Sequence, residues 1–276
     1  MNKILVIIFL IVAIAVLASI TILWPKPNFE QQLHNYADES SNTISVHFQL
    51  LNSGETIDIN PDEKYTPSSL LKVRVMMAFL ALAQNDPSIL ERKLNYDGQI
   101  DFNARQTIKP SNPISAGKYT VKVLIERMII FSDNNALFVL HTSGIVSDQV
   151  FDRVLSFLGI QAPSISADSQ DFMTPADYSK LLLALNNSTF LNETMSQKAI
   201  AILLSTQFKE GLRAGVGNTP MAHKFGEAPG QFHDCGIVYH SKPYVLCVMT
   251  KGSDQQELIQ NIKDISEMTY NYVNNL

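Results

Sequence analysis

Strand-like segments stand near both ends of this 276-residue chain, and only helical patterns lie between them. Residues 43–50 alternate and are rich in β-branched side chains, and a turn leads from them into a second strand at 55–59. Near the other end, 221–226, 236–240 and 244–250 are typical of three strands in a meander. The two ends can share one sheet, so we expect an α/β fold of the α+β type. It combines a five-stranded antiparallel sheet built from both chain ends with flanking helices and an inserted all-helical lobe.

The intervening sequence has apolar residues at helical spacing. Helices are predicted at 69–85, 119–141 with an interruption near Ser132, 147–158, 174–186, 193–206 and 254–274. We therefore predict one domain over 43–276. Its sheet lobe takes about 43–66 and 207–276, and its helical lobe takes about 67–206.

The first 26 residues have a different character. Residues 4–24 carry no charge and are almost entirely aliphatic, and as a helix they would be about 30 Å long, the thickness of a bilayer core. We expect residues 1–26 to form a transmembrane helix that anchors the chain, with Trp24 at the membrane interface. A cleaved signal segment is the alternative. Residues 27–42 are predicted to form a polar tether.

Charge and cysteine content exclude several classes of partner. The net charge of -5 gives no basic surface for nucleic acid. Cys235 and Cys247 flank a predicted turn and can face each other across a hairpin, but two buried thiols are favoured over a disulfide. Neither cysteine lies beside a plausible set of zinc ligands, so neither a metal nor another cofactor is expected, and we predict a monomer.

A serine near the start of a predicted helix is the first chemical signal. Thr66 suits an N-cap and Pro67 the first helical position, so Ser69 falls in the first turn, where free N–H groups favour negative charge. Lys72 follows at i+3 on the same face, and a desolvated amine can take the serine proton. A second Ser-x-x-Lys at 115–118 lies in a loop with Pro and Gly, and we interpret it as structural.

Two further motifs follow along the chain. Ser-Asp-Asn at 132–134 breaks an apolar run; Ser132 could relay a proton and Asn134 could bind a substrate amide, although a plain turn explains the segment equally well. Lys-Phe-Gly at 224–226 lies on a predicted strand. Its Gly226 suits a backbone that runs close to a ligand, although Lys224 could also be a solvated strand residue.

Ser-x-x-Lys, Ser-Asp-Asn and Lys-Thr-Gly, in this order, mark class A β-lactamases and penicillin-binding proteins. From about residue 40 to its end, the chain resembles this class A β-lactamase-like, penicillin-binding superfamily of serine hydrolases. The resemblance implies that Ser69 attacks a carbonyl and becomes acylated while Lys72 accepts its proton. It also implies that Ser132 and Lys224 handle proton return and the substrate carboxylate. The backbone N–H groups of Ser69 and Glu227 would form the oxyanion hole. Substrate binding is assigned to Asn134, Gly226 and Glu227.

Two departures from the family pattern stand out. Phe225 replaces the Thr or Ser whose hydroxyl helps to hold the substrate carboxylate, and we expect its ring to narrow the groove beside the strand. The family's loop glutamate, which activates the deacylating water, is absent because no glutamate lies between Glu126 and Glu193. In the corresponding loop, Asp171 resembles a structural acid and Asp168 is the other acid present.

The resemblance therefore implies a serine acyl-enzyme hydrolase that acts on β-lactams or on D-Ala-D-Ala-type amide bonds of peptidoglycan stem peptides. The missing glutamate keeps two alternatives open: a penicillin-binding D,D-peptidase, and a slowly acylating sensor or binding protein. The expected location is membrane-anchored and extracytoplasmic, in a periplasm or at the cell surface.

Overall fold

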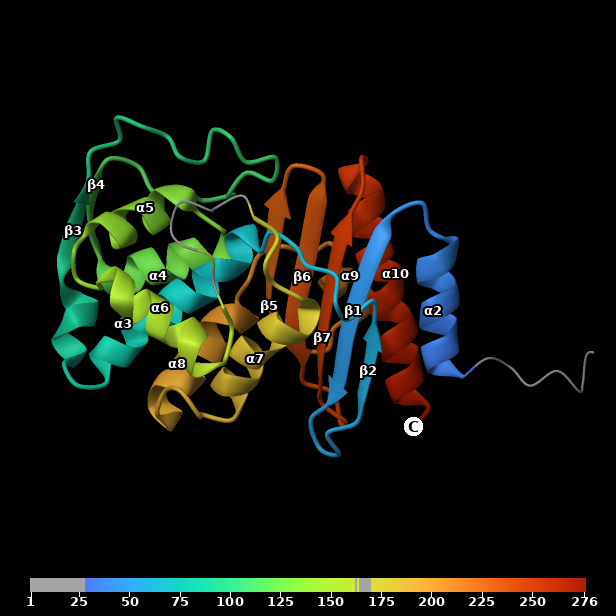
Figure 1. The fold of residues 1–276 in the computed structure, drawn as a ribbon. Coiled ribbons are helices and arrows are strands. Elements are labelled where there is room, and N and C mark those ends of the chain that lie inside the picture. The colour runs from blue at the N-terminus through green and yellow to red at the C-terminus, as the bar shows by residue number, and fades with distance from the viewer. Residues whose placement is uncertain (1–27, 162, 164–169) are drawn as a thin grey trace, which may run out of the picture.

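One antiparallel sheet joins the two ends of the chain (Figure 1). The structure is a computed structural model that describes residues 28–161, 163 and 170–276. The strand order is β2-β1-β7-β6-β5. The strands are β1 (Thr43–Leu50), β2 (Thr56–Ile59), β5 (Met221–Ala228), β6 (Gln231–Val238) and β7 (Tyr244–Lys251). β1 pairs with β7 along its whole length, so the predicted five-stranded sheet built from both chain ends is confirmed.

The helices follow the predicted order, and those within residues 68–204 fill the side of the sheet that faces left in Figure 1. In that region lie η1 (Ser68–Leu71), α3 (Lys72–Ala83), η2 (Pro87–Glu91), α4 (Val121–Ile130), α5 (Asn134–Thr142), α6 (Asp148–Phe157), α7 (Pro175–Asn186) and α8 (Glu193–Leu204). A small sheet of β3 (Lys93–Tyr96) and β4 (Gly117–Thr120), which the sequence did not indicate, joins them. The predicted break near Ser132 separates α4 from α5. There Ser132 has a positive φ of 58°, and the Asp133 side chain caps α5.

The two faces of the sheet belong to two hydrophobic cores. On the face that is turned toward the helical region, buried residues of β5, β6 and β7 pack with α3, α4, α7 and α8. The opposite face packs against α10 (Gln255–Asn274) and α2 (Phe29–Glu39), with the short α9 (Leu212–Gly215) beside α10. The five-stranded sheet is therefore covered on both sides, and its edge strand β5 faces the helical region.

Residues 29–39 form helix α2 instead of the predicted polar tether. The Phe29 ring stacks on Tyr272 of α10 with 4.2 Å between centroids and meets Phe48 edge-on. Phe29, Leu33 and Ala37 recur at helical spacing and form a narrow buried face, which the polar residues between them conceal in the sequence.

A disulfide joins Cys235 to Cys247, so the prediction of two unpaired thiols was wrong. The two residues are directly opposite in the β6–β7 register, and both are fully buried. Side chains that face each other in neighbouring antiparallel strands lie close enough to bond, and the exact register could not be read from the sequence.

The predicted membrane anchor at 1–26 and the loop acid Asp168 lie outside the described residues. Among residues 28–161, 163 and 170–276, no helix has the length and apolar character needed to cross a bilayer.

Candidate active site

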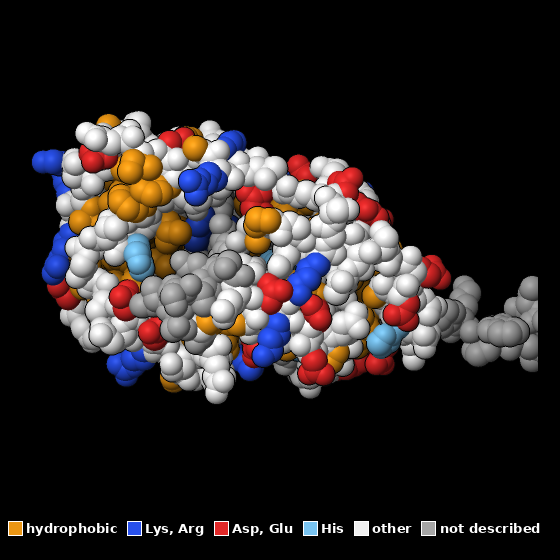
Figure 2. Space-filling model, turned by 45° about the horizontal axis from the view of Figure 1, so that its top comes forward, with side chains coloured by type: hydrophobic (Ala, Val, Ile, Leu, Met, Phe, Trp, Pro, Cys, Tyr) orange, Lys and Arg blue, Asp and Glu red, His pale blue; other side chains and the backbone are white. Residues whose placement is uncertain are grey.

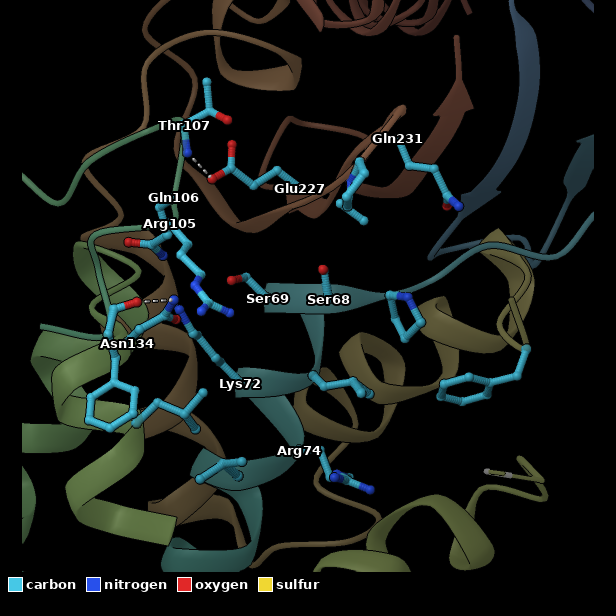
Figure 3. A pocket seen from close by; sticks show the side chains of 18 of the residues that line it. Ser68, Ser69, Lys72, Arg74, Arg105, Gln106, Thr107, Asn134, Glu227 and Gln231 are labelled. Carbon is cyan, nitrogen blue, oxygen red and sulfur yellow. Dashed lines mark hydrogen bonds between the residues drawn. The ribbon is translucent and has the colours of Figure 1, made fainter. Parts of the chain in front are cut away.

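Ser69 lies in the short helix η1, which leads directly into α3 at Lys72. Pro67 precedes η1 without a capping side chain, so the predicted N-cap at Thr66 was wrong. The Thr66 hydroxyl instead donates to Asp171 Oδ1 at 2.7 Å, because pairing of Tyr65 with Met173 brings this acid alongside. Ser69 is partly exposed, and Figure 3 shows its hydroxyl directed into a pocket.

Three segments that are far apart in the sequence converge beside Ser69. Lys72 Nζ donates to Ser132 O at 2.7 Å and to Ser132 Oγ at 3.1 Å. Lys224 Nζ, from β5, reaches the same Ser132 Oγ at 3.0 Å and also donates to Phe225 O at 2.8 Å. Within the described part of the chain, no hydrogen bond joins Lys72 to Ser69 Oγ. The predicted residues thus form a chain of contacts in which Ser132 links both amines.

Both amines are removed from water: Lys72 is 2% exposed and Lys224 is 0% exposed. Burial lowers the pKa of Lys72 well below its usual 10.5, and the positive charge of Lys224 lowers it further. Burial also lowers the pKa of Lys224 to about 7, against the opposing charges of Asp234 and Glu227. Both shifts favour the neutral form of the amine, which is the form that can accept a proton from a serine.

A polar network holds the Ser-Asp-Asn turn. The buried Asp133 carboxylate accepts from Asn103 Nδ2 at 2.9 Å and from the Ile114 N–H at 2.7 Å. Asn103 Oδ1 accepts from the Asn134 N–H at 2.7 Å, and Asn134 Nδ2 donates to Phe102 O at 3.3 Å. The segment between β3 and β4 thus fixes Ser132 and Asn134. The sequence analysis missed this role, and the cluster of Asp and Asn at 101–103 was the one available signal.

β5 runs close against η1, and Gly226 makes this possible. A Cβ at Gly226 would lie 2.8 Å from Pro67 O and 3.2 Å from Leu70 N. The sequence predicted that the backbone at this glycine runs close to a ligand; in the structure its close neighbour is the helix that carries Ser69.

Phe225 does not narrow the groove as predicted. Its ring is 4% exposed and packs against Phe208, at 4.4 Å between centroids, and against Phe232 in the core shared with α10. The ring also lies 4.1 Å from Lys224 Nζ. Successive side chains of a strand point to opposite faces of the sheet, and Phe225 belongs to the face that packs against α10 and not to the pocket.

Glu227 contributes its side chain as well as its backbone. Its carboxylate accepts from the Thr107 N–H at 2.8 Å, from the Ile108 N–H at 3.3 Å and from Gln255 Nε2 at 3.0 Å (Figure 3). The sequence analysis considered only the backbone N–H of this residue and missed these contacts.

A cavity of about 860 Å³ opens in front of Ser69. Figure 2 shows the hollow on the face turned forward, with basic and hydrophobic side chains at its walls. Ser69, Lys72, Asn134 and Glu227 line it, together with Arg105 and Gln106. Ser132, Lys224 and Phe225 lie behind this lining. In the part of the chain that the structure describes, no group of three His, Cys, Asp or Glu residues could hold a metal ion.

Comparisons with known proteins agree with this geometry. The sequence profile of the β-lactamase enzyme family matches residues 28–273. The solved structure of PBP-A superposes with a TM-score of 0.77 at 21% identity, over 92% of this chain and 98% of that one. A β-lactamase from Sphaerobacter thermophilus gives 0.76 at 18% identity, over 90% of this chain and 98% of that one. A class A β-lactamase from Mycobacterium abscessus gives 0.74 at 18% identity, over 90% of this chain and 100% of that one.

No curated protein matches the chain significantly in sequence. A variant of PBP-A has been solved as an acyl-enzyme complex with penicillin G. At identities of 21% or less, these likenesses establish the fold, and the profile match establishes the family.

Proposed function

Because the chain belongs to the β-lactamase enzyme family, as a serine hydrolase of the class A type, we propose that it cleaves β-lactam or D-Ala-D-Ala-type amide bonds through an acyl-enzyme on Ser69. The observation that carries this proposal is the convergence of both lysine amines on Ser132 Oγ, directly behind the cavity that Ser69 lines.

In the proposed acylation, Lys72 acts as a neutral amine. Its two N–H bonds are directed to Ser132 O and Oγ, which leaves its lone pair to accept the Ser69 proton. Ser69 Oγ then forms a bond to the carbonyl carbon. The C–N bond breaks, and the proton passes through Ser132 to the departing nitrogen while Lys224 supports the Ser132 hydroxyl.

The carbonyl oxygen gains negative charge during this step, and we assign its stabilisation to the backbone N–H groups of Ser69 and Glu227. The close packing of β5 on η1 at Gly226 supports this assignment, since it brings the two backbone segments together. Asn134, which lines the cavity beside Lys72, is proposed to bind the substrate amide (Figure 3).

Hydrolysis of the acyl-enzyme is proposed to be the slow step. Three of the described acids line the cavity: Glu227, Asp152 and Asp148. Glu227 is held by three donors, Asp152 lies 3.8 Å from Arg74 Nη1, and Asp148 is exposed in the first turn of α6. Among the described residues, no hydrogen bond joins any of these acids to Ser69, Lys72 or Ser132. This favours the second candidate function, a penicillin-binding D,D-peptidase or a sensor whose lactam adduct persists, over a fast β-lactamase. An anchor at residues 4–24, with the domain outside the cytoplasm, would place the site near peptidoglycan.

A fluorescent penicillin tests these alternatives on the full chain. Label that appears and then disappears within minutes after the free ligand is quenched would indicate a β-lactamase. Label that stays for hours would indicate a peptidase or a sensor. If Ser69→Ala matches the wild-type protein in labelling and in every hydrolysis assay, the proposal is wrong.

A further inference from the structure

Arg105 occupies the rim of the Ser69 cavity. It stands in the tight turn closed by the Gln106 N–H and Asn103 O at 3.1 Å, and it is among the residues that line the cavity. In Figure 3 its side chain extends from this turn toward the end of the pocket where Ser69 and Lys72 lie. A positively charged side chain therefore faces the nucleophile from the loop side.

The turn that carries Arg105 is anchored on both sides of the site. On the helical side, Gln106 Nε2 donates to Ser132 O at 2.9 Å. On the sheet side, the Thr107 N–H donates to the Glu227 carboxylate at 2.8 Å. Lys109 Nζ closes the base of the turn through Asn103 O at 2.8 Å and Ala104 O at 2.6 Å. The backbone that carries Arg105 is therefore held from both sides of the site.

The other positively charged residues around the site already have partners within the protein. Lys72 is buried and bonded to Ser132, and Arg74 lies 3.8 Å from Asp152 through its Nη1. Lys224, the residue expected to hold the substrate carboxylate, is enclosed by Ser132 Oγ, Phe225 O and the Phe225 ring, and does not line the cavity.

No carboxylate among residues 28–161, 163 and 170–276 pairs with Arg105. Its side chain is exposed to solvent. A guanidinium also offers two parallel N–H donors, which match the geometry of a carboxylate.

We propose that Arg105 binds the substrate's carboxylate and thereby selects anionic substrates. The group is the ring carboxylate of a penicillin or the C-terminal carboxylate of a D-Ala-D-Ala peptide. This inference deepens the proposed function and rests on it. Arg105 takes over a role that Phe225 cannot perform, since Phe225 has no hydroxyl, and that the enclosed Lys224 cannot reach.

The test compares two ligands that differ in one charge: a fluorescent penicillin with a free carboxylate, and its methyl ester. The second-order rate of Ser69 acylation is measured for the wild-type protein, Arg105→Gln, Arg105→Lys and the matched control Lys118→Gln. The control removes the same charge from an exposed residue of β4 outside the cavity. Thermal unfolding of each variant checks that the fold is kept.

We expect Arg105→Gln to slow acylation by the free acid roughly 10- to 100-fold, the usual range for a lost charged hydrogen bond. The rate with the ester should change no more than about 2-fold, within ordinary surface effects. The rate at which the free acid acylates Arg105→Lys should lie between those of the wild-type protein and Arg105→Gln, because lysine keeps the charge and loses the paired donors. Lys118→Gln should match the wild-type protein with both ligands.

Two results would overturn the inference and leave the proposed function intact: a wild-type protein that reacts equally fast with acid and ester, or an Arg105→Gln rate that falls equally with both. A wild-type protein that reacts with neither ligand would contradict the proposed function, and the inference with it.

Discussion

The chain contains Ser-x-x-Lys twice, and only the copy at Ser69 lines the cavity and has a buried lysine. Ser69 and Lys72 lie on consecutive helical turns, with Lys72 2% exposed and bonded to Ser132. Ser115 and Lys118 are both exposed. Ser115 stands in a loop where Tyr119 Oη donates to its carbonyl oxygen at 2.9 Å, and Lys118 lies on β4.

The contrast shows that spacing alone does not make a nucleophile. Residues three apart share a face on a helix but not in an extended segment, so the second copy cannot bring its amine over its serine. Burial then lowers the pKa of Lys72, which supports the base role proposed for this amine. The predictions below pair each substitution at the first site with a matching substitution in the second copy.

Removal of the nucleophile should have the largest effect. Ser69→Ala should abolish covalent labelling by a fluorescent penicillin, because the hydroxyl that forms the ester is gone. Ser115→Ala should label at the wild-type rate, as measured by gel fluorescence over time. Equal loss of label in the two variants would contradict the distinction between the copies.

Removal of the base should come next. Lys72→Met should slow acylation by about 10²- to 10⁴-fold, the usual contribution of a general base, whereas Lys118→Met should change little. The free energy of unfolding should not fall, since Met avoids the cost of burying an amine and Ser132 O keeps its bond from Gln106. Thermal unfolding separates the two effects, and a Lys72→Met protein that still acylates at the wild-type rate would exclude this base.

The pH dependence follows from the lowered pKa of Lys72. Only the neutral amine accepts a proton, so the acylation rate should rise as pH increases through this pKa and level off well below 10.5. The folded protein loses its proton first, so between the folded pKa and 10.5 the free energy of unfolding should also rise with pH. For Lys224 this window begins at about 7.

Lys118→Met should keep this pH profile, since Lys118 is exposed on β4. Stopped-flow acylation measured from about pH 5 to pH 9 gives the profile. A rate that does not vary with pH over this range would argue against a lysine base.

The smallest expected effect comes from a single methyl group. Gly226→Ala places a Cβ 2.8 Å from Pro67 O and should lower the free energy of unfolding by about 1–3 kcal/mol while slowing acylation. Gly117→Ala, inside the second copy, meets nothing nearer than a Tyr119 ring atom at 3.5 Å and should be neutral. Denaturant unfolding compares the two, and equal stabilities would show that β5 need not pack so closely on η1.

Much of the fold was predictable because its signals are local. Alternation along 43–50 and helical periodicity along 174–186 need no information from elsewhere in the chain, and both were confirmed as β1 and α7. The three ordered motifs also assigned Lys72, Ser132 and Lys224 to one site, and the structure shows both amines bonded to Ser132 Oγ.

The errors arose where a distant contact decides the local state. Thr66 was predicted to cap a helix, but its hydroxyl donates a hydrogen bond to Asp171. Polar residues at 27–42 suggested a tether, although Phe29 finds a partner in Tyr272, more than two hundred positions away. Arg105 and the Glu227 carboxylate were missed because neither belongs to a periodic or motif-like pattern, and their roles exist only in the folded loop.

The central claim is that Ser69 becomes acylated, and peptide mapping by mass spectrometry tests it directly. The full chain is incubated with penicillin G, its intact mass is measured, and the modified peptide is sequenced. The account predicts one adduct of the whole ligand mass, since the opened lactam loses no atoms, on the hydroxyl of Ser69. An adduct on the peptide that carries Ser115, or one that persists in Ser69→Ala, would contradict it.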